Sequence, residues 1–430
     1  MPTSERRSAA PANEGEAAQP PEDPPTAGER SQRTRWRTPR LHILDWIALG
    51  LLLVGALCVL SGALPVADAR ASIVRLVPLL LFLGSVIILA ELTAAAEVFD
   101  VIATRLSIIG RGHYPLLFLL CVTLAAATTI TLNLDTTAVL LTPVILALAT
   151  ALGIPPLPLA MTTVWLSNTA SLLLPVSNLT NLLAADRVAL SPSRFAAQMW
   201  APQLAAILVT AGCLWIWYWR RGQRGGQLKY ELPQRRVPAD RPLFVVAAVA
   251  CLVFVVGILV GVPIGIASAV SAGVLVVAFF VRKRSQLRFG LIPWRLLVFV
   301  IGLFLVIDTL GRHGLGSLIQ SVVGADDGAL GAARAAGAGA GLSNLVNNLP
   351  AYVAGEAIIP PDNHIQLLAL LIGTNVGPVI TPWASLATLL WYERCHAVGV
   401  KVPLGRFMWT GAILAVTALA ASVGVLLVVG

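Results

Sequence analysis

Long apolar runs recur from residue 44 almost to the C-terminus of this sequence. Most of them approach the ~20 residues that a helix needs to cross the hydrocarbon core of a bilayer. Charged residues make up only 12% of the chain, about half of the fraction in a soluble domain. The fold class is therefore an all-α polytopic membrane protein, and soluble enzyme classes are excluded. The runs lie near residues 44–63, 73–90, 114–130, 136–152, 157–184, 196–219, 242–261, 263–281, 291–310, 334–359, 365–392 and 405–429.

The first 43 residues precede the first apolar run and differ from it in composition. Pro, Ser, Glu, Ala and Arg dominate them without apolar periodicity, which is typical of a disordered tail. A cleaved signal peptide is the alternative, but the long charged lead favours a retained first helix. We therefore predict a cytoplasmic tail (1–43), a first transport repeat (44–219), a basic cytoplasmic linker (220–241), a connecting helix (242–262) and a second, inverted transport repeat (263–430).

Lys and Arg residues are distributed unevenly between the segments that join the apolar runs. With the N-terminus in the cytoplasm, and with 114–152 and 334–359 each folding back as a re-entrant hairpin, the inner segments hold 24 basic residues and the outer segments six. Cytoplasmic loops of membrane proteins show this bias. We therefore predict about nine full spans plus two hairpins in a bacterial inner (plasma) membrane, with the C-terminus outside. The net charge of +9 reflects this topology, and no nucleic-acid partner is expected.

One segment of the chain repeats at a constant offset. Residues 167–183 resemble residues 374–390 at an offset of 207, with five identical positions that include one Asn and one Pro. The same offset aligns Pro143 with Pro350 in the two predicted hairpins. By the charge count the first segment runs from inside to outside and the second in the opposite direction. The sequence thus predicts two inverted-topology repeats, each with a re-entrant hairpin and an interrupted helix, which is an architecture of secondary transporters.

Polar residues concentrate at four points where the predicted helices break. Pro175 and Pro382 each free a helix carbonyl in mid-membrane, where polar groups must face protein or a water-filled cavity. Four such breaks suit a central substrate- or ion-binding site; the alternative is that they only stabilise the broken helices. The candidate binding residues are Asn133, Asp135, Thr136, Thr137, Ser177, Asn178, Thr180, Asn181, Asn344, Asn347, Asn348, Thr381, Ser385 and Thr388.

Asp135 is the first candidate for proton coupling. A carboxylate at a hairpin tip is costly in a membrane unless it is functional or paired, and the alternative is that it caps the returning helical arm. Asp308 and Glu356 are the next candidates, although Asp308 lies near the outer end of its span. Glu91 is assigned instead to an interfacial helix on the inner face.

The motifs of other protein classes are absent from this sequence. The sequence contains no HExxH, no GxGD and no Walker A loop, so neither a membrane-embedded enzyme nor a P-loop ATPase is expected. The five Cys residues show no paired spacing, so we predict neither a metal site nor a disulfide. A channel is disfavoured, because inverted repeats within one chain favour alternating access. The chain is therefore predicted to be a secondary transporter without catalytic residues or cofactors, and H⁺ or Na⁺ is the coupling ion.

Four stretches resemble the arsenite-efflux permease (arsenical pump membrane protein) family of the ion transporter superfamily. They are Asn133–Val144, Asn168–Asp186, Asn344–Pro350 and, most specific, Gly373–Trp391 (GTNVGPVITPWASLATLLW). The resemblance implies proton-coupled efflux of arsenite or antimonite and, in some members, a separate cytoplasmic ATPase. A homodimer is a further alternative for the oligomeric state. The superfamily includes divalent anion/sodium symporters. Alternatives are therefore a sodium- or proton-coupled carrier of another anion, such as a dicarboxylate, and a sodium/proton antiporter.

The side chains of the four stretches indicate which substrate the protein can bind. The carriers considered above transport a small inorganic or organic anion. Arsenite at neutral pH is mainly an uncharged trihydroxide, which amide and hydroxyl side chains suit. The same oxygen atoms also suit a sodium ion. No Lys or Arg lies in the stretches, which disfavours a dianionic substrate, although helix N-termini can hold carboxylates. Apart from membrane lipid, no other partner is predicted.

Overall fold

The computed structural model describes residues 43–220, 229–232, 237–324 and 328–429. The chain divides into two units, Met1–Leu44 and Asp45–Gly430, and the second contains the helices apart from the first residues of α2. Most of the predicted tail and much of the predicted linker therefore lie outside the described residues. Within the described ranges the regular structure is helical, apart from one isolated β-bridge between His113 and Lys229.

The helices follow the apolar runs, and several extend beyond them. The first half contains α2 (Ile43–Leu60), α3 (Val66–Ala95), α4 (Val98–Ile109), α5 (Tyr114–Thr131), α6 (Leu134–Leu152), α7 (Pro156–Thr169), the 3₁₀ turn η1 (Pro175–Ser177), α8 (Leu179–Arg187), α9 (Pro192–Leu214) and the π-helical turn η2 (Trp215–Trp219). The second half contains α10 (Arg241–Leu259), α11 (Ile264–Arg282), η3 (Arg284–Gln286), η4 (Phe289–Leu291), α12 (Trp294–Leu310), η5 (Gly311–Leu315), α13 (Gly316–Val323), α14 (Gly328–Val346), α15 (Asn348–Glu356), α16 (His364–Val376), α17 (Leu386–Ala397) and α18 (Leu404–Val429).

Seven segments of the described chain are long and apolar enough to cross a membrane. Shorter apolar helices lie in α2, α10 and α16. The chain is a multi-pass membrane protein, as the sequence predicted. The seven segments are Leu76–Ala95, Tyr114–Thr131, Leu134–Leu152, Pro192–Trp219, Gly265–Arg282, Leu296–Gly314 and Leu404–Val429.

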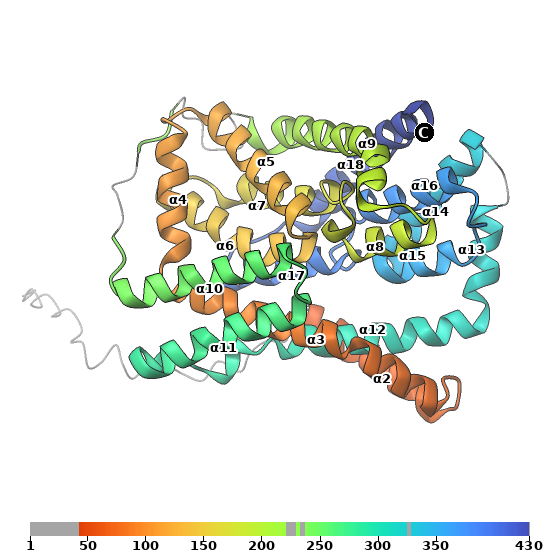
Figure 1. Ribbon diagram of the computed structural model, residues 1–430, viewed down its shortest axis with the longest axis horizontal. Coiled ribbons are helices and arrows are strands. Elements are labelled where there is room, and N and C mark those ends of the chain that lie inside the picture. The colour runs from red at the N-terminus through yellow and green to blue at the C-terminus, as the bar shows by residue number, and fades with distance from the viewer. Residues whose placement is uncertain (1–42, 221–228, 233–236, 325–327, 430) are drawn as a thin grey trace, which may run out of the picture. The chain divides into compact units, whose positions relative to one another are not determined.

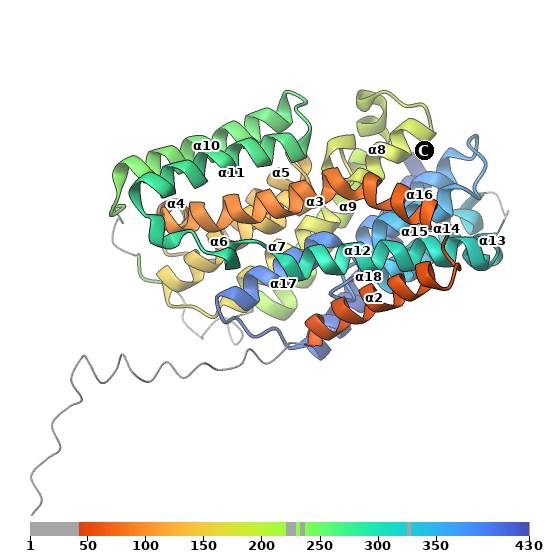
Figure 2. The same cartoon turned by 90° about the horizontal axis from the view of Figure 1, so that it is seen from below.

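Helices α2, α3, α10, α11 and α12 form one group, which we call the α3 layer (Figures 1 and 2). α3 packs along α11 and α12, and α10 pairs with α11. The Ser85 and Ser268 hydroxyls lie 2.7 Å apart and join α3 to α11. A Cβ on Gly302 of α12 would overlap the backbone of α2 at Leu52. The absence of a side chain there lets the two helices approach closely.

Helices α5 to α9 and α14 to α18 form a second group, which we call the core group. α9 packs on α18, α14 on α16, and α6 on both α7 and α17. A Cβ on Gly373 of α16 would overlap the carbonyl of Ala336 in α14, so these two helices meet at backbone distance. Trp391 is fully buried and donates from Nε1 to the Ala160 carbonyl at 2.9 Å. This contact joins α17 to α7, whose ends form part of the site described below.

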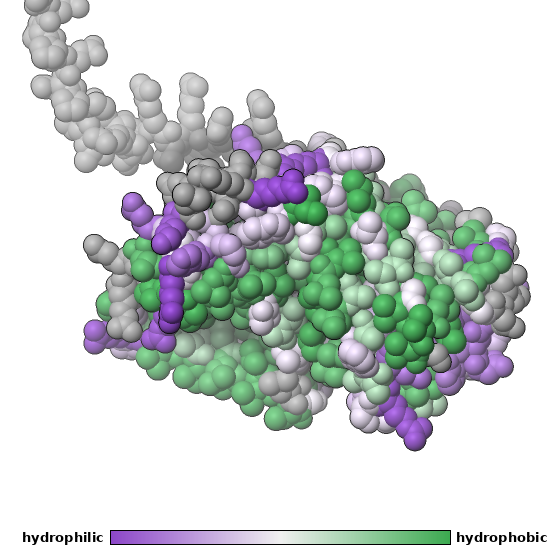
Figure 3. Space-filling view, turned by 90° about the horizontal axis from the view of Figure 1, so that it is seen from above, coloured by the Kyte–Doolittle hydropathy of each residue, from purple (hydrophilic) through white to green (hydrophobic). Residues whose placement is uncertain are grey.

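Charged contacts gather toward the ends of the long helices, and Figure 3 shows hydrophobic residues between two hydrophilic ends on the face in view. At one end, Glu91 of α3 pairs with Arg394 of α17 at 2.6 Å, and the β-bridge joins His113 to Lys229. Glu91 lies in α3 and not in the interfacial helix that the sequence predicted, because α3 continues unbroken to Ala95.

Two further ion pairs lie at opposite ends of the α3 layer. Asp240 lies 3.2 Å from Arg282, and the backbone N–H of Leu243, together with Arg282, holds the pKa of the Asp240 carboxyl below its ordinary value. At the opposite end of the α3 layer, Arg312 pairs with Asp68. Each of these pairs joins segments that the basic-residue count assigns to the same side of the membrane. The grouping of the loops therefore agrees with the predicted topology, and the side that faces the cytoplasm stays a prediction.

Candidate functional site

Two helices of the core group break at matching positions. α7 ends at Thr169 and α16 at Val376, while α8 begins after Asn178 and α17 after Ser385, so both pairs differ by 207 residues. Asn178 (φ −155°, ψ 145°) and Ser385 (φ −140°, ψ 153°) are both extended, and each side chain accepts a hydrogen bond from a backbone N–H in the first turn of the helix that follows. The offset found in the sequence thus corresponds to one local structure, an extended break closed by an N-cap.

The two helix pairs α5–α6 and α14–α15 do not follow that offset. Their turns lie at Asn133 and Asn347, which are 214 residues apart. Pro143 lies ten residues after the first turn and Pro350 three residues after the second, so the two prolines are not structurally equivalent. Asn347 has φ 96°, a region that non-glycine residues rarely adopt. Its Nδ2 donates to the Trp383 carbonyl at 3.0 Å, which holds the turn against the second break.

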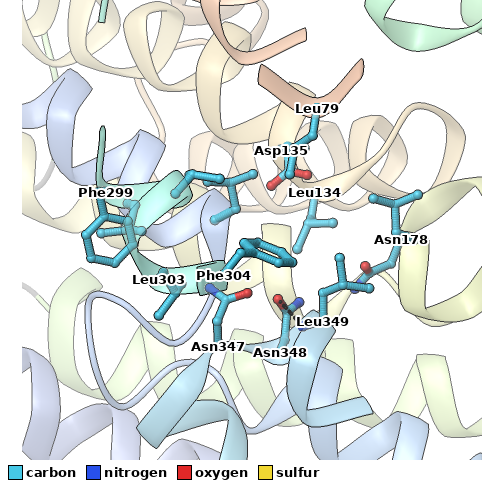
Figure 4. Close-up of a pocket in the computed structure, with 14 residues that line it drawn as sticks. Leu79, Leu134, Asp135, Asn178, Phe299, Leu303, Phe304, Asn347, Asn348 and Leu349 are labelled. Atoms are coloured by element: carbon cyan, nitrogen blue, oxygen red, sulfur yellow. Dashed lines mark hydrogen bonds between the residues drawn. The ribbon is translucent and has the colours of Figure 1, made fainter. Parts of the chain in front are cut away.

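A small cavity lies where these breaks and turns meet the α3 layer (Figure 4). Its volume is about 40 Å³, and one water needs roughly 10–15 Å³, so it has room for a solute of a few heavy atoms. None of its lining residues is basic. The polar ones are Asp135, Asn178, Asn347 and Asn348; the apolar ones are Leu79, Leu134, Leu179, Phe299, Val300, Leu303, Phe304, Leu349, Leu386 and Leu389.

Asp135 contributes the only carboxylate among these lining residues. Its Oδ1 is buried and accepts no hydrogen bond from the residues that the structure describes. Asp135 does not cap α6, because Asn133 Oδ1 accepts the Thr136 N–H at 2.7 Å and fills that position. The alternative of a capping Asp is therefore not what the structure shows, and the carboxylate lies in the first turn, where the helix dipole favours a negative charge.

Other residues of the predicted site fasten the first turn to the first break. Thr137 Oγ1 donates to the Asn133 carbonyl at 2.9 Å and accepts from Thr129 Oγ1 at 3.1 Å. Ser177 Oγ donates across to the Ile130 carbonyl at 2.8 Å. These hydroxyl groups do not line the cavity, and they position the backbone that carries Asp135 and Asn178.

Asn344 fastens the second turn to the second break in a similar way. Its Oδ1 accepts the Thr381 N–H at 3.0 Å, and its Nδ2 donates to the Gly377 carbonyl at 2.9 Å. The indole N–H of Trp383 donates to the Asn344 carbonyl at 2.9 Å. Asn344 and Thr381, both predicted to bind substrate, thus hold the backbone of the break and do not line the cavity.

Two asparagines outside the predicted set connect the breaks to each other. Asn375 of α16 donates from Nδ2 to Asn181 Oδ1 at 2.6 Å, and its Oδ1 accepts from Asn178 Nδ2 at 3.0 Å and Thr180 Oγ1 at 2.7 Å. Asn168 of α7, at the equivalent position, donates to Thr388 Oγ1 at 3.2 Å. The sequence carried a signal for both residues, because they are the identical Asn pair at offset 207.

Comparison with known proteins identifies the family to which the chain belongs. A family model described as citrate transporter (CitMHS) matches residues 41–373. The arsenical pump membrane protein of Yersinia enterocolitica is 32% identical over 352 residues, which cover 77% of this chain and 81% of that protein. The chain belongs to the arsenical pump membrane protein family. The resemblance noted in the sequence is thereby confirmed, and the protein is a membrane transporter of the ion transporter superfamily.

Further proteins are similar to this chain over most of its length. The arsenical pump membrane protein of Escherichia coli strain K12 is 31% identical, with 77% of this chain and 81% of that protein covered. The crystal structure of the Alcanivorax borkumensis YdaH transporter is similar with a TM-score of 0.41 and 15% identity, covering 90% of this chain and 97% of that chain. A putative arsenical pump membrane protein of Bacillus subtilis is 22% identical over 88% of this chain and 92% of its own length.

Asp308 and Glu356, the other two carboxylates predicted for proton coupling, do not line the cavity. Asp308 accepts a hydrogen bond from the Ser72 hydroxyl, within the α3 layer. Glu356 ends α15, and Arg187 donates to its backbone carbonyl at 3.4 Å. Only Asp135 of the three lines the cavity beside the asparagines of the breaks.

Proposed function

We propose that this protein exports arsenite or antimonite from the cytoplasm in exchange for protons. The observation that carries the proposal is the cavity in which the carboxylate of Asp135, whose Oδ1 has no hydrogen-bond partner among the described residues, lies with the neutral amides of Asn178, Asn347 and Asn348. The hydroxyl groups of an uncharged trihydroxide donate and accept hydrogen bonds, and amides offer both partners. The names of the curated relatives, arsenical pump membrane proteins, support the same class of substrate.

A citrate-like substrate, which the name of the family model suggests, fits this cavity less well. Several carboxylates would lie beside Asp135, with no basic residue in the walls to compensate them. Unpaired charges in a desolvated site are strongly unfavourable. Citrate is also several times larger than arsenite, and the cavity measures about 40 Å³. The size and charge of the cavity therefore favour the small neutral solute.

The coupling follows from two exclusive states of Asp135. The ionised carboxylate accepts a hydrogen bond from an arsenite hydroxyl and so favours substrate binding. The protonated carboxyl is uncharged and donates its hydrogen to a neighbouring oxygen. The free-energy cost of moving the empty cavity from access on one side of the membrane to access on the other is then lower. Arsenite and the proton then occupy the cavity in turn, and net exchange results.

The exchange requires that the cavity open to each side of the membrane in turn, and we infer that two inverted repeats provide this. The equal offset of the two helix breaks supports the repeats. Re-entrant folding of α5–α6 is supported at both of its ends. Tyr114 packs on Tyr230 with ring centroids 5.4 Å apart, and Gly153 lines a cavity of about 650 Å³ with Lys401. Both Tyr230 and Lys401 belong to segments that the basic residues assign to the cytoplasm.

Transport in everted membrane vesicles tests the proposal. An acid-inside pH gradient should drive labelled arsenite into vesicles that contain the parent protein, and Asp135→Asn should abolish this uptake. Counterflow, which exchanges labelled for unlabelled arsenite without net proton movement, should persist in that variant. Asp308→Asn is the matched control and should keep gradient-driven uptake, because its carboxylate lies outside the cavity. Full gradient-driven uptake by Asp135→Asn would remove Asp135 from the coupling mechanism.

A sodium-coupled carrier is the second candidate. The buried Oγ1 of Thr136, which follows Asp135, has no hydrogen-bond partner among the described residues, and hydroxyl and carboxylate oxygens are ligands for hard cations. The same vesicles separate the candidates when an outward sodium gradient replaces the pH gradient. Uptake driven by sodium alone would favour the second candidate and exclude proton exchange as the primary coupling.

A further inference from the structure

Asn168 and Asn375 occupy equivalent positions in the two repeats but differ in how their amides are satisfied. Both are fully or almost fully buried, with exposed fractions of 0% and 1%. The side-chain oxygen Oδ1 of Asn375 accepts two hydrogen bonds. The side-chain oxygen Oδ1 of Asn168 accepts none from the described residues. A buried amide oxygen without a donor costs about 1–3 kcal/mol, so its retention in the core requires an explanation.

The hydrogen-bond network fixes the orientation of both amides. Asn168 Nδ2 donates to the Val164 carbonyl at 2.9 Å, and a carbonyl can only accept, so the free atom is the oxygen. Asn181 donates from Nδ2 to the Ser171 carbonyl at 2.6 Å, which leaves its Oδ1 to accept from Asn375. Rotation of either amide by 180° would oppose like groups, so the difference between Asn168 and Asn375 does not arise from a flipped amide.

The residues opposite the two amides explain the difference. At offset 207, Ser385 takes the place of Asn178, and Ala387 takes the place of Thr180. Asn178 and Thr180 are the two donors to Asn375. Ala387 has no donor, and the Ser385 hydroxyl bonds instead to Thr388 Oγ1 at 2.8 Å. Asn168 therefore loses both of the donors that its counterpart has.

The Ser385–Thr388 pair also has one hydroxyl hydrogen to spare. Ser385 Oγ accepts the Thr388 N–H at 3.1 Å, and Thr388 Oγ1 accepts from Asn168 Nδ2 at 3.2 Å. Two hydroxyl hydrogens remain, and the mutual bond uses one of them. The second has no acceptor within the described part of the chain. One free acceptor and one free donor thus lie on directly bonded side chains.

We propose that Asn168 Oδ1 and the Ser385–Thr388 pair form the position that binds one hydroxyl group of the transported trihydroxide. A neutral O–H group satisfies both partners at once, since it donates to the amide oxygen and accepts from the side-chain hydroxyl. A carboxylate would face the Asn168 oxygen with like charge. Ser385 and Thr388 directly precede Leu386 and Leu389 of the cavity wall in the sequence, and they and Asn168 are themselves fully buried and not among the lining residues. The identity of the hydroxyl group rests on the proposed function.

Competition in counterflow tests this position without depending on proton coupling. The probes are unlabelled arsenite and methylarsonous acid, in which a methyl group replaces one hydroxyl, each competing with labelled arsenite. A neutral hydrogen bond corresponds to roughly a threefold to tenfold difference in affinity. The parent should prefer arsenite over methylarsonous acid by about this factor. Asn168→Leu should bind arsenite more weakly by a similar factor and lose the preference.

Two further variants keep the test decisive. Asn168→Ser can still donate to the Val164 carbonyl as helical serines do, but it is too short to offer the acceptor, so it should lose the preference even if Asn168→Leu fails to fold. Thr163→Val is the matched control, because its hydroxyl is equally buried in α7 and also has no partner in the described residues. It should keep the preference of the parent.

The outcomes separate this inference from the proposed function. Arsenite counterflow by the parent, with an unchanged preference in both Asn168 variants, would overturn the inference and leave a trapped water as the occupant. Absence of arsenite counterflow in the parent itself would overturn the proposed function. Loss of the preference in the Asn168 variants with its retention in Thr163→Val would establish the position as part of the substrate site.

Discussion

The two broken helices share their backbone geometry but differ in how their hydrogen bonds are satisfied. In the first break, Asn178, Thr180 and Asn181 are all bonded to Asn375 of α16. In the second break, Asn168 donates to Thr388, and its side-chain oxygen Oδ1 has no donor among the described residues. Two breaks with the same backbone geometry therefore differ in which side-chain atoms have hydrogen-bond partners. The hydrogen bonds of the first break join α8 to α16, whereas the second break keeps the free acceptor that we propose binds a hydroxyl group of the substrate.

The largest effect on stability is expected at the contact between the first break and Asn375. Asn375→Leu leaves two buried donors and one buried acceptor without partners, and each costs about 1–3 kcal/mol. The free energy of unfolding should fall by on the order of 3 kcal/mol or more. Asn168→Leu removes bonds to two oxygens only and should cost less. Thermal unfolding of the purified variants measures both, and equal losses would contradict the comparison.

The next effect concerns the two N-caps of the breaks, of which Asn178 lines the cavity and Ser385 belongs to the proposed hydroxyl-binding position. Asn178→Ala and Ser385→Ala each remove one neutral hydrogen-bonding partner, so each should weaken arsenite binding roughly threefold to tenfold. The double variant should deviate from additivity if both side chains contact one substrate. Neither residue is charged, so the pH dependence of transport should stay as in the parent. Normal arsenite binding with a lost response to sodium would identify the breaks as a cation site.

The smallest effect should come from making the second break resemble the first. Ala387→Ser adds a hydroxyl where the first repeat has Thr180, and this hydroxyl should donate to Asn168 Oδ1. Stability should rise by about 0.5–1.5 kcal/mol, while the preference for arsenite over methylarsonous acid should decline. Ala387→Gly, the control, removes only a methyl group. If Ala387→Ser leaves both stability and preference unchanged, the free oxygen of Asn168 is not within reach of position 387.

The sequence was most informative where local chemistry determines the structure. Pro175 and the polar residues around it predicted the break between α7 and α8, because a proline and unsatisfied backbone groups interrupt a membrane helix. The turns were harder to align. Pro143 and Pro350 match at the offset of the breaks, yet they lie at different distances from Asn133 and Asn347. A proline is tolerated at several places in such helices, so it does not mark the turn.

Interactions between distant segments could not be predicted. The sequence contains Asp135, Asp308 and Glu356 as comparable acidic residues, and only the packing of α6 against the breaks distinguishes the first. The same holds for Asn168, whose free oxygen depends on residues 217 and more positions away in the chain. The sequence shows that polar residues concentrate at the breaks, but their division into cavity-lining and backbone-holding groups depends on three-dimensional contacts.

Proton movement driven by arsenite is the most direct test of the coupling through Asp135. The purified protein is incorporated into liposomes that contain a pH-sensitive dye, and an arsenite gradient is imposed at equal pH on both sides. We expect protons to move against the arsenite flux, and this movement should disappear in Asp135→Asn while arsenite counterflow continues. Arsenite flux without proton movement, or proton movement of the same size in Asp135→Asn, would contradict the account.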